Sequence, residues 1–175
     1  LVEGTGSNDL VDVIIQQVSQ TENLKSFTMK NIRMLHLEQG AKMEMSENFV
    51  VTKANLHSLI MKSSSELTGR NITIVDVYNL TLASGAAIHT DARGHDASSE
   101  PGYGCDYNGD DGWAYRSRWG GTHGGKGGSG RGSCASSLTV YGDKDAPTTM
   151  GGGAINVKGG GVVRLDVSGV LTMKS

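Results

Sequence analysis

The stretch that decides the fold is Asn31-Ile-Arg-Met-Leu-His-Leu37, which recurs further along the chain as Asn55-Leu-His-Ser-Leu-Ile-Met61. The match continues at the same offset, because residues 41–43 (AKM) fall on residues 65–67 (SEL). A repeat of this kind is typical of proteins that stack one small supersecondary unit on the next.

Weaker matches extend the repeat in both directions. Residues 23–29 resemble an earlier copy, and residues 48–51 (NFVV) match 71–74 (NITI). At a slightly shorter offset, residues 59–61 match 80–82, and residues 65–67 match 86–88. The repeat covers residues 23–90, and its period of roughly 21–24 residues belongs to the range of solenoid proteins.

Within each copy, apolar and polar residues alternate, as in Leu35-His-Leu37, Met43-Glu-Met45 and Val75-Asp-Val77. Alternation with period two marks strands that bury one face, whereas a helical repeat would place apolar residues three and four positions apart. Each unit holds about three short strands. The sequence therefore predicts an all-β chain, folded as a right-handed parallel β-helix (β-solenoid) with one coil per repeat.

Three asparagines, Asn31, Asn55 and Asn79, are evenly spaced at the interval of the repeat and have two interpretations. At equivalent corners of successive coils, their side chains would hydrogen-bond to one another in a ladder along the stack. The alternative is that they are ordinary turn residues at the surface.

Composition divides the chain into four segments. Residues 1–22 form an N-terminal strand or capping segment, in which Val11-Asp-Val-Ile-Ile15 favours a strand over a helix. Coils occupy residues 23–90, a loop region rich in glycine, aromatic and acidic residues occupies 91–136, and glycine-rich coils occupy 137–175. Because the chain starts with Leu and stops within a strand-like pattern, we expect a segment of a longer protein.

The bulk properties exclude several classes of function. The net charge of −2 and the pI near 6.2 give no reason to expect nucleic acid or an acidic membrane surface as a partner. No stretch approaches the ~20 apolar residues of a membrane-spanning helix, so we expect no membrane insertion in this segment.

Glycine dominates the second half, which reads GGTHGGKGGSGRGS from Gly120 and GGGAINVKGGGVVRLDVSGVLTMKS from Gly151. The intervening strand-like runs distinguish it from a flexible linker. Glycine is expected here where backbone passes close to backbone or where φ is positive. We also expect Ser168-Gly169 to be a turn between two strands.

A series of anchor residues stands between these glycines: His123, Tyr141, Pro147, Thr148, Arg164, Leu165 and Leu171. With them, residues 85–173 resemble a glycine-rich β-helix repeat found in very large secreted or surface proteins of protists and other eukaryotes. The resemblance implies stacked β-helix coils with a structural or adhesive role and continuation into a further coil; it does not imply catalytic residues.

Two features favour an extracellular protein. Cys105 and Cys134 bracket the most glycine-rich stretch, and a disulfide between them would stabilise it by roughly 3–4 kcal/mol. Asn71 and Asn79 each begin an N-glycosylation sequon. Two buried free thiols and unoccupied sequons are the alternatives.

The loop region also contains the candidate binding residues. A loose calcium site would use Asp106, Asn108, Asp110 and Asp111, whose oxygen ligands suit that ion; the alternative is an acidic turn. A contact surface for a neighbouring domain, a further copy or a glycan would use Tyr103, Tyr107, Trp113, Tyr115 and Trp119.

The sequence thus predicts a structural segment of a large extracellular β-solenoid protein, such as a filament, cell coat or appendage. Its partners would be further copies or other domains of the same protein. One alternative is a carbohydrate-binding or adhesion module that uses the aromatic residues. A second is a carbohydrate-active β-helix enzyme that uses Asp110 and Asp111, although their order relative to His95 does not match that enzyme class.

Overall fold

The computed structural model describes residues 2–3, 11–16, 29–30, 32–45, 48–52, 56–95, 123, 141–143, 145, 148–153 and 158–175. All regular structure in these residues is β-strand, and the strands of successive repeats pair in parallel. The described residues contain no helix that could cross a membrane. The chain divides into two compact units, one made of Leu1–His89 with Val163–Ser175 and the other of Thr90–Val162.

The strands are β1 (Val2–Glu3), β2 (Val11–Ile15), β3 (Met29–Lys30), β4 (Ile32–Leu37), β5 (Lys42–Glu44), β6 (Asn48–Thr52), β7 (Leu56–Met61), β8 (Glu66–Thr68), β9 (Asn71–Leu82), β10 (Ala87–His89) and β11 (Val162–Met173).

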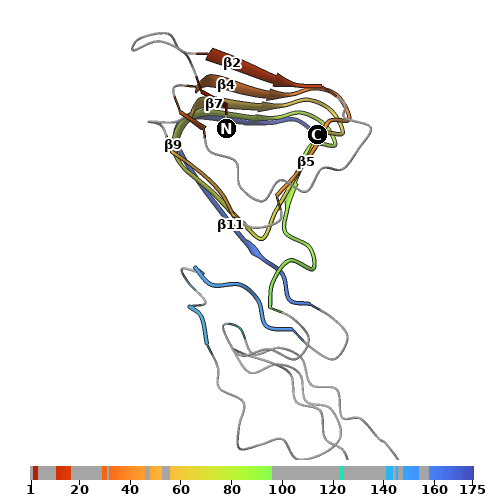
Figure 1. The fold of residues 1–175 in the computed structure, drawn as a ribbon, viewed down its shortest axis with the longest axis vertical. Helices are drawn as coiled ribbons and strands as arrows, with labels where there is room; N and C mark the ends of the chain where they lie inside the picture. Colours follow the sequence, from red (N-terminus) through yellow and green to blue (C-terminus); the bar gives the residue numbers. More distant parts are fainter. Residues whose placement is uncertain are drawn as a thin grey trace, which may run out of the picture. The chain divides into compact units, whose positions relative to one another are not determined.

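Strands β1 and β3 pair with each other in parallel, and the other strands of the first unit form three parallel rows (Figure 1). The first row contains β2, β4, β7, the end of β9 and β11, and the second contains β5, β8 and β10. The third row contains β6 and the start of β9, because β9 pairs with β6 over Asn71–Val75 and with β7 over Asn79–Leu82. Each repeat of the sequence therefore adds one strand to each row in turn.

In the described strands, the register follows the offsets of the sequence repeat. In the first row, Leu35 lies opposite Leu59, and Leu59 lies opposite Leu80. In the second row, Met43 lies opposite Leu67. Strand β2 is also confirmed, since Val13 lies opposite Leu35.

The apolar side chains of successive repeats stack into buried columns. One column contains Leu35, Leu59 and Leu80, which are all completely buried, and a second continues from Leu37 to Met61. Phe49 and Ile72 form a similar contact in the third row. Each fully buried side chain stabilises the fold by roughly 1.5–3 kcal/mol, so these columns are the main source of stability.

Of the two interpretations of the asparagines, the ladder is wrong as regards Asn79. Asn79 lies opposite Ser58, and its Nδ2 donates a hydrogen bond to Ser58 Oγ at 3.4 Å. The reason is a shorter corner between the third and first rows, where Asp76 takes a left-handed conformation (φ 54°) within the continuous strand β9. The repeat therefore becomes shorter at this point, so that Asn79 no longer occupies the position equivalent to Asn55. Asn31 and Asn55 themselves lie outside the described residues.

The turn between the first and second rows has the same backbone conformation in all three repeats. Gly40, Ser64 and Gly85 occupy equivalent positions and have φ values of 71°, 59° and 72°. The amide of Ser64 donates to the carbonyl oxygen of Ser84 at 3.3 Å, and that of Gly40 donates to Ser63 at 3.1 Å. Two of the three turns therefore use the residue that this conformation favours.

In the second unit, glycine allows three backbone segments to approach closely, as the sequence predicted. Gly94 N donates to Gly159 O at 2.7 Å, and Gly151 N donates to Gly160 O at 2.7 Å. A Cβ atom on Gly159 would lie 2.0 Å from Gly151 O, and one on Gly94 would lie 2.3 Å from Gly160 O. No side chain fits at either position.

Candidate interaction edge at strand β11

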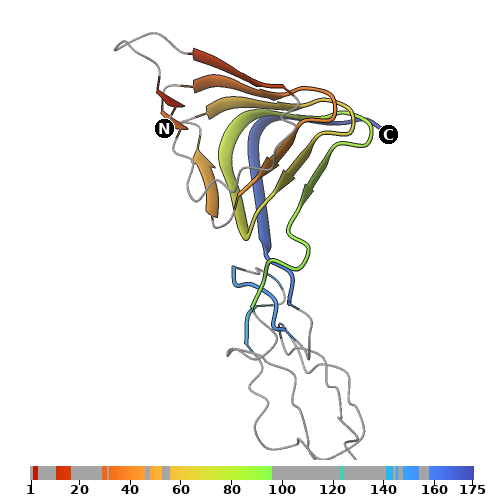
Figure 2. The ribbon, with the colours of Figure 1, turned by 45° about the vertical axis from the view of Figure 1, so that its right-hand side comes forward.

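Strand β11 continues the first row beyond β9 (Figure 2). The amide of Lys174 donates to the carbonyl oxygen of Leu82 at 2.9 Å. The amide of Ala83 donates to Met61 in the same way, and Met61 lies directly opposite Leu82. By the same pattern Met173 lies opposite Leu82, and Leu171, two residues earlier, lies opposite Leu80.

The predicted turn at Ser168-Gly169 is wrong, because both residues lie inside the continuous strand β11. Gly169 lies beside Tyr78 of β9. A Cβ atom at Gly169 would lie 2.3 Å from the carbonyl oxygen of Tyr78 and 2.8 Å from its ring. The glycine is therefore required by a close approach between strands, a situation that local sequence does not distinguish from a turn.

The apolar columns of the first unit are uncovered at β11. Leu80 is completely buried, whereas Leu171, the next member of its column, is 50% exposed. Met173 is 71% exposed and Leu165 is 42% exposed. Among the described residues, strand β11 has a neighbouring strand on one side only, and this accounts for the exposure.

The backbone at this edge also offers hydrogen-bonding groups. Because Lys174 N points to β9, and successive residues of a strand alternate in direction, the N–H and C=O groups of Leu171 and Met173 point away from β9. Among the described residues, no strand pairs with this side of β11. An edge of this kind is a template for a further strand.

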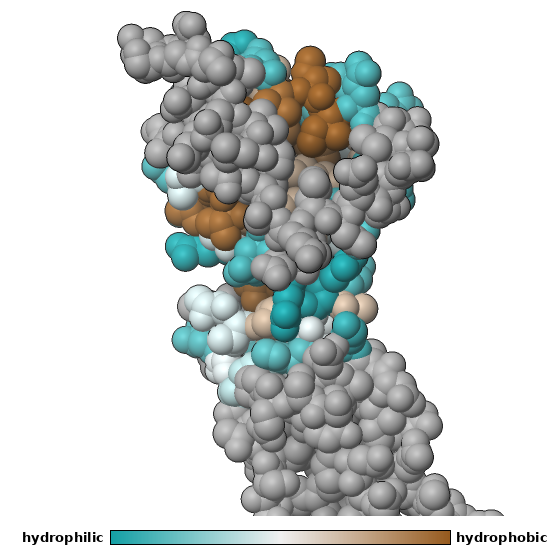
Figure 3. Space-filling model, in the orientation of Figure 1, coloured by the Kyte–Doolittle hydropathy of each residue, from teal (hydrophilic) through white to brown (hydrophobic). Residues whose placement is uncertain are grey.

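We call the outward N–H and C=O groups of Leu171 and Met173, together with the exposed side chains of Leu165, Leu171 and Met173, the β11 edge. In the orientation of Figure 1, hydrophobic side chains of the strand-bearing part also reach the surface beside hydrophilic ones (Figure 3). Chemically, the β11 edge suits an extended polypeptide with alternating apolar side chains, since it combines a row of backbone groups with an apolar strip.

Tyr78, an exposed aromatic residue beside this edge, is not available as a stacking platform for a sugar. Its ring stacks on the ring of His57, with centroids 5.0 Å apart and an angle of 19° between the planes. Its ring also lies close to Gly169 of the adjacent strand. Because its ring packs against both His57 and Gly169, Tyr78 has a role in strand packing.

The second unit contains a separate aromatic cluster. The rings of His123 and Tyr141 meet edge to face at 5.0 Å, and that of His95 lies 6.1 Å from Tyr141. His123 Nε2 lies 3.0 Å from Thr149 Oγ1, and the Tyr141 hydroxyl donates to the carbonyl oxygen of Met150. Burial raises the pKa of Tyr141. Two of the sequence anchors, His123 and Tyr141, are thus in contact.

Of the site residues predicted from sequence, the structure describes the two sequon asparagines. Both are half-buried in β9, where Asn71 Oδ1 accepts a hydrogen bond from Thr73 Oγ1 at 2.9 Å. Within the described residues there is no group of three His, Cys, Asp or Glu that could hold a metal ion. Outside the described residues lie Cys105, Cys134, Asp106, Asn108, Asp110, Asp111, Tyr103, Tyr107, Trp113, Tyr115 and Trp119.

The sequence predicts further copies as partners, but sequence reasoning did not identify β11 as the edge that would receive them. Leu171-Thr-Met173 copies Leu80-Thr-Leu82, and this match gives the register of β11 directly.

Comparison of the chain with models of protein families, with curated proteins and with solved structures finds no significant match. The resemblance of residues 85–173 to glycine-rich repeats stays a prediction.

Proposed function

We propose that this chain is a structural segment of a β-solenoid, a right-handed parallel β-helix, that associates through the β11 edge with further β-strands. The observation that carries the proposal is the exposure of Leu171, which occupies the same column as the completely buried Leu59 and Leu80. A repeat scaffold buries its core by stacking neighbours, so an uncovered last repeat is suited to receive another strand.

Association would extend two interactions that already exist within the chain. The outward N–H and C=O groups of β11 would pair with an added strand, as those of β9 pair with β7. The exposed parts of Leu171 and Met173 would become buried, with a gain of roughly 25 cal/mol per Å² of apolar surface. The role is mechanical, a continuous hydrogen-bonded ladder around an apolar interior.

The proposed setting is an extracellular filament, cell coat or appendage. Its support is the pair of sequons at Asn71 and Asn79 and the two cysteines, which are typical of secreted proteins when they form a disulfide. Mass spectrometry of the protein from its native source would test this setting, through glycans on Asn71 and through a bond between Cys105 and Cys134. Unmodified asparagines together with free thiols would contradict it.

Association is tested by sedimentation velocity over a range of protein concentrations. The unmodified chain is expected to form oligomers whose size grows with concentration, and Leu171→Lys is expected to abolish them. The control is Val50→Lys, because Val50 is similarly exposed (53%) but lies on β6, away from the β11 edge. A chain that stays monomeric at all concentrations, or a Leu171→Lys variant that associates normally, contradicts the proposal.

A further inference from the structure

The first row has a second end, at strand β2. Within the described residues, β2 pairs with β4 and is the last strand of the sheet on that side. Val13 and Ile15 continue the two apolar columns but are only partly buried, and Ile14 is 54% exposed. The row therefore ends in partly uncovered apolar side chains at β2 as well as at β11.

The backbone directions at the two ends are complementary. The carbonyl oxygen of Ile15 accepts a hydrogen bond from Glu38, directly after β4, so the groups of Ile14 and Gln16 point to the opposite, outer side. At the other end, the groups of Leu171 and Met173 point outward. If β2 of a second molecule followed β11, Gln16 N would reach Met173 O by the pattern that joins Glu38 N to Ile15 O.

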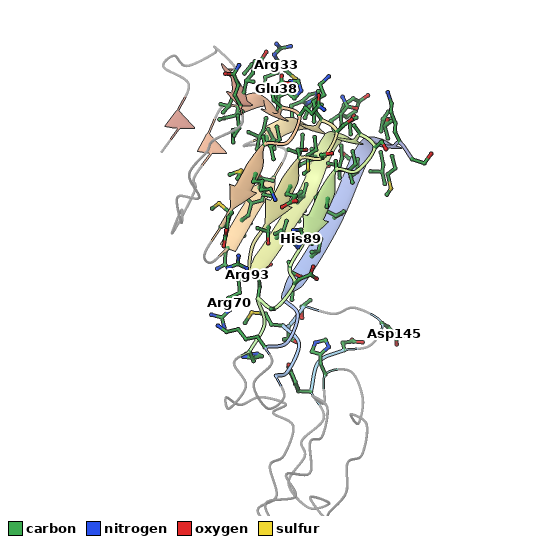
Figure 4. All side chains as sticks on the ribbon, turned by 90° about the vertical axis from the view of Figure 1, so that its right-hand side faces the viewer. Arg33, Glu38, Arg70, His89, Arg93 and Asp145 are labelled. Carbon is green, nitrogen blue, oxygen red and sulfur yellow. The ribbon has the colours of Figure 1, made fainter. Side chains whose placement is uncertain are left out.

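The side chains at the two ends also match. With Met173 opposite Ile15 of the second molecule, Leu171 meets Val13, and both columns continue without a break. On the outer side, Thr172 meets Ile14, and Lys174 meets Gln16, so no like charges face one another. Asp12 is already paired with Arg33, which lies with Glu38 on the outer side of the first row (Figure 4).

We propose that the partner of the β11 edge is strand β2 of a second copy of this chain, paired in parallel and in register. This inference rests on the proposed function and names its partner. The contact is heterologous, because each molecule contributes a different edge. Repetition of the contact by translation along the stack leaves both ends open and produces a filament rather than a closed ring.

The test uses one blocked edge at a time. Ile14→Pro removes an outward N–H from β2 and leaves the bonds between β2 and β4 in place, so it blocks the β2 edge. Leu171→Lys blocks the β11 edge. Each variant alone is expected to be monomeric in sedimentation velocity, whereas an equimolar mixture is expected to form dimers and no larger species, because one free edge of each kind remains.

A second measurement is independent of these substitutions. Thr172→Cys and Ile14→Cys molecules are mixed, treated with a short bis-maleimide cross-linker, digested and analysed by mass spectrometry. The yield of the cross-linked peptide pair that joins positions 172 and 14 is expected to be several-fold higher than the yield of the pair that joins positions 166 and 14. The second pair comes from a control mixture in which Asp166→Cys replaces Thr172→Cys. Equal yields from the two mixtures would overturn the inference.

The outcomes separate the two proposals. If Leu171→Lys prevents association but Ile14→Pro does not, the β11 edge binds another partner, so the inference fails and the proposed function stands. If the unmodified chain does not associate, the proposed function fails with it. Dimers in either variant alone would indicate a symmetric contact and would also overturn the inference.

Discussion

At the scale of single residues, the turn at Ser64 shows that the same left-handed backbone conformation costs more free energy in one repeat than in the other two. Gly40 and Gly85 adopt positive φ at little cost, whereas Ser64, at the equivalent position, has φ 59° and carries a Cβ atom. The left-handed conformation costs a residue other than glycine roughly 1–2 kcal/mol. Ser64 is therefore a point of local strain in an otherwise regular turn.

We expect Ser64→Gly to stabilise the protein by about 0.5–1 kcal/mol, because the relief of the left-handed conformation exceeds what glycine costs through the greater freedom of the unfolded chain. The free energy of unfolding is measured by urea denaturation. Ser63→Gly serves as the control, because Ser63 shares the turn but not the positive φ, and it should lower stability. A loss of stability in Ser64→Gly would contradict the explanation.

At the scale of elements, the columns explain which parts of the fold were predictable from sequence. The register of β4, β7 and β9 could be predicted because Leu35, Leu59 and Leu80 recur within strand-like alternation, at the two offsets that the sequence repeat shows. That pattern is set by burial on one face, which the sequence records directly. The position of Asn79 opposite Ser58 follows from the shorter offset that places residues 80–82 on 59–61, but the cause of that offset, the left-handed conformation of Asp76, has no signature in the neighbouring sequence.

The misinterpretation of β11 has a similar cause. Ser168-Gly169 has the composition of a turn, and the opposing contact that explains the glycine comes from Tyr78, which is far away in the sequence. Information of this kind is not local. The β11 edge depends on the same long-range pairing, since Leu171 is exposed by its place at the end of a column and not by its residue type.

Because Leu59 and Leu171 are members of one column, their truncation should have very different effects. Leu59→Ala is expected to cost about 2–5 kcal/mol, the usual penalty for a cavity at a completely buried leucine. For the monomer, Leu171→Ala is expected to cost less than about 1 kcal/mol, because half of its side chain is already exposed. Urea denaturation at low protein concentration gives both values. Equal losses would show that Leu171 is enclosed and that the edge is not open.

At the scale of the whole molecule, the second unit is an insertion at one defined corner. In the second repeat, Gly69 and Arg70 join β8 of the second row to β9 of the third. In the third repeat, residues 90–161 occupy the same place between β10 and β11. Since β10 pairs with β8 and β11 with β9, the insertion joins the same two rows that Gly69 and Arg70 join.

This arrangement predicts that the second unit is dispensable for the fold of the first. A chain in which Gly-Arg replaces residues 90–161 is expected to keep its β-type circular dichroism and a single cooperative urea transition. Its stability should match or exceed that of the parent, because closure of a long loop costs more entropy than closure of a short turn. If the shortened chain lost its cooperative transition while the parent kept it, the strands of the first unit would depend on the insertion. The three rows would then not be a self-supporting scaffold, and the glycine-rich segment would be part of their core.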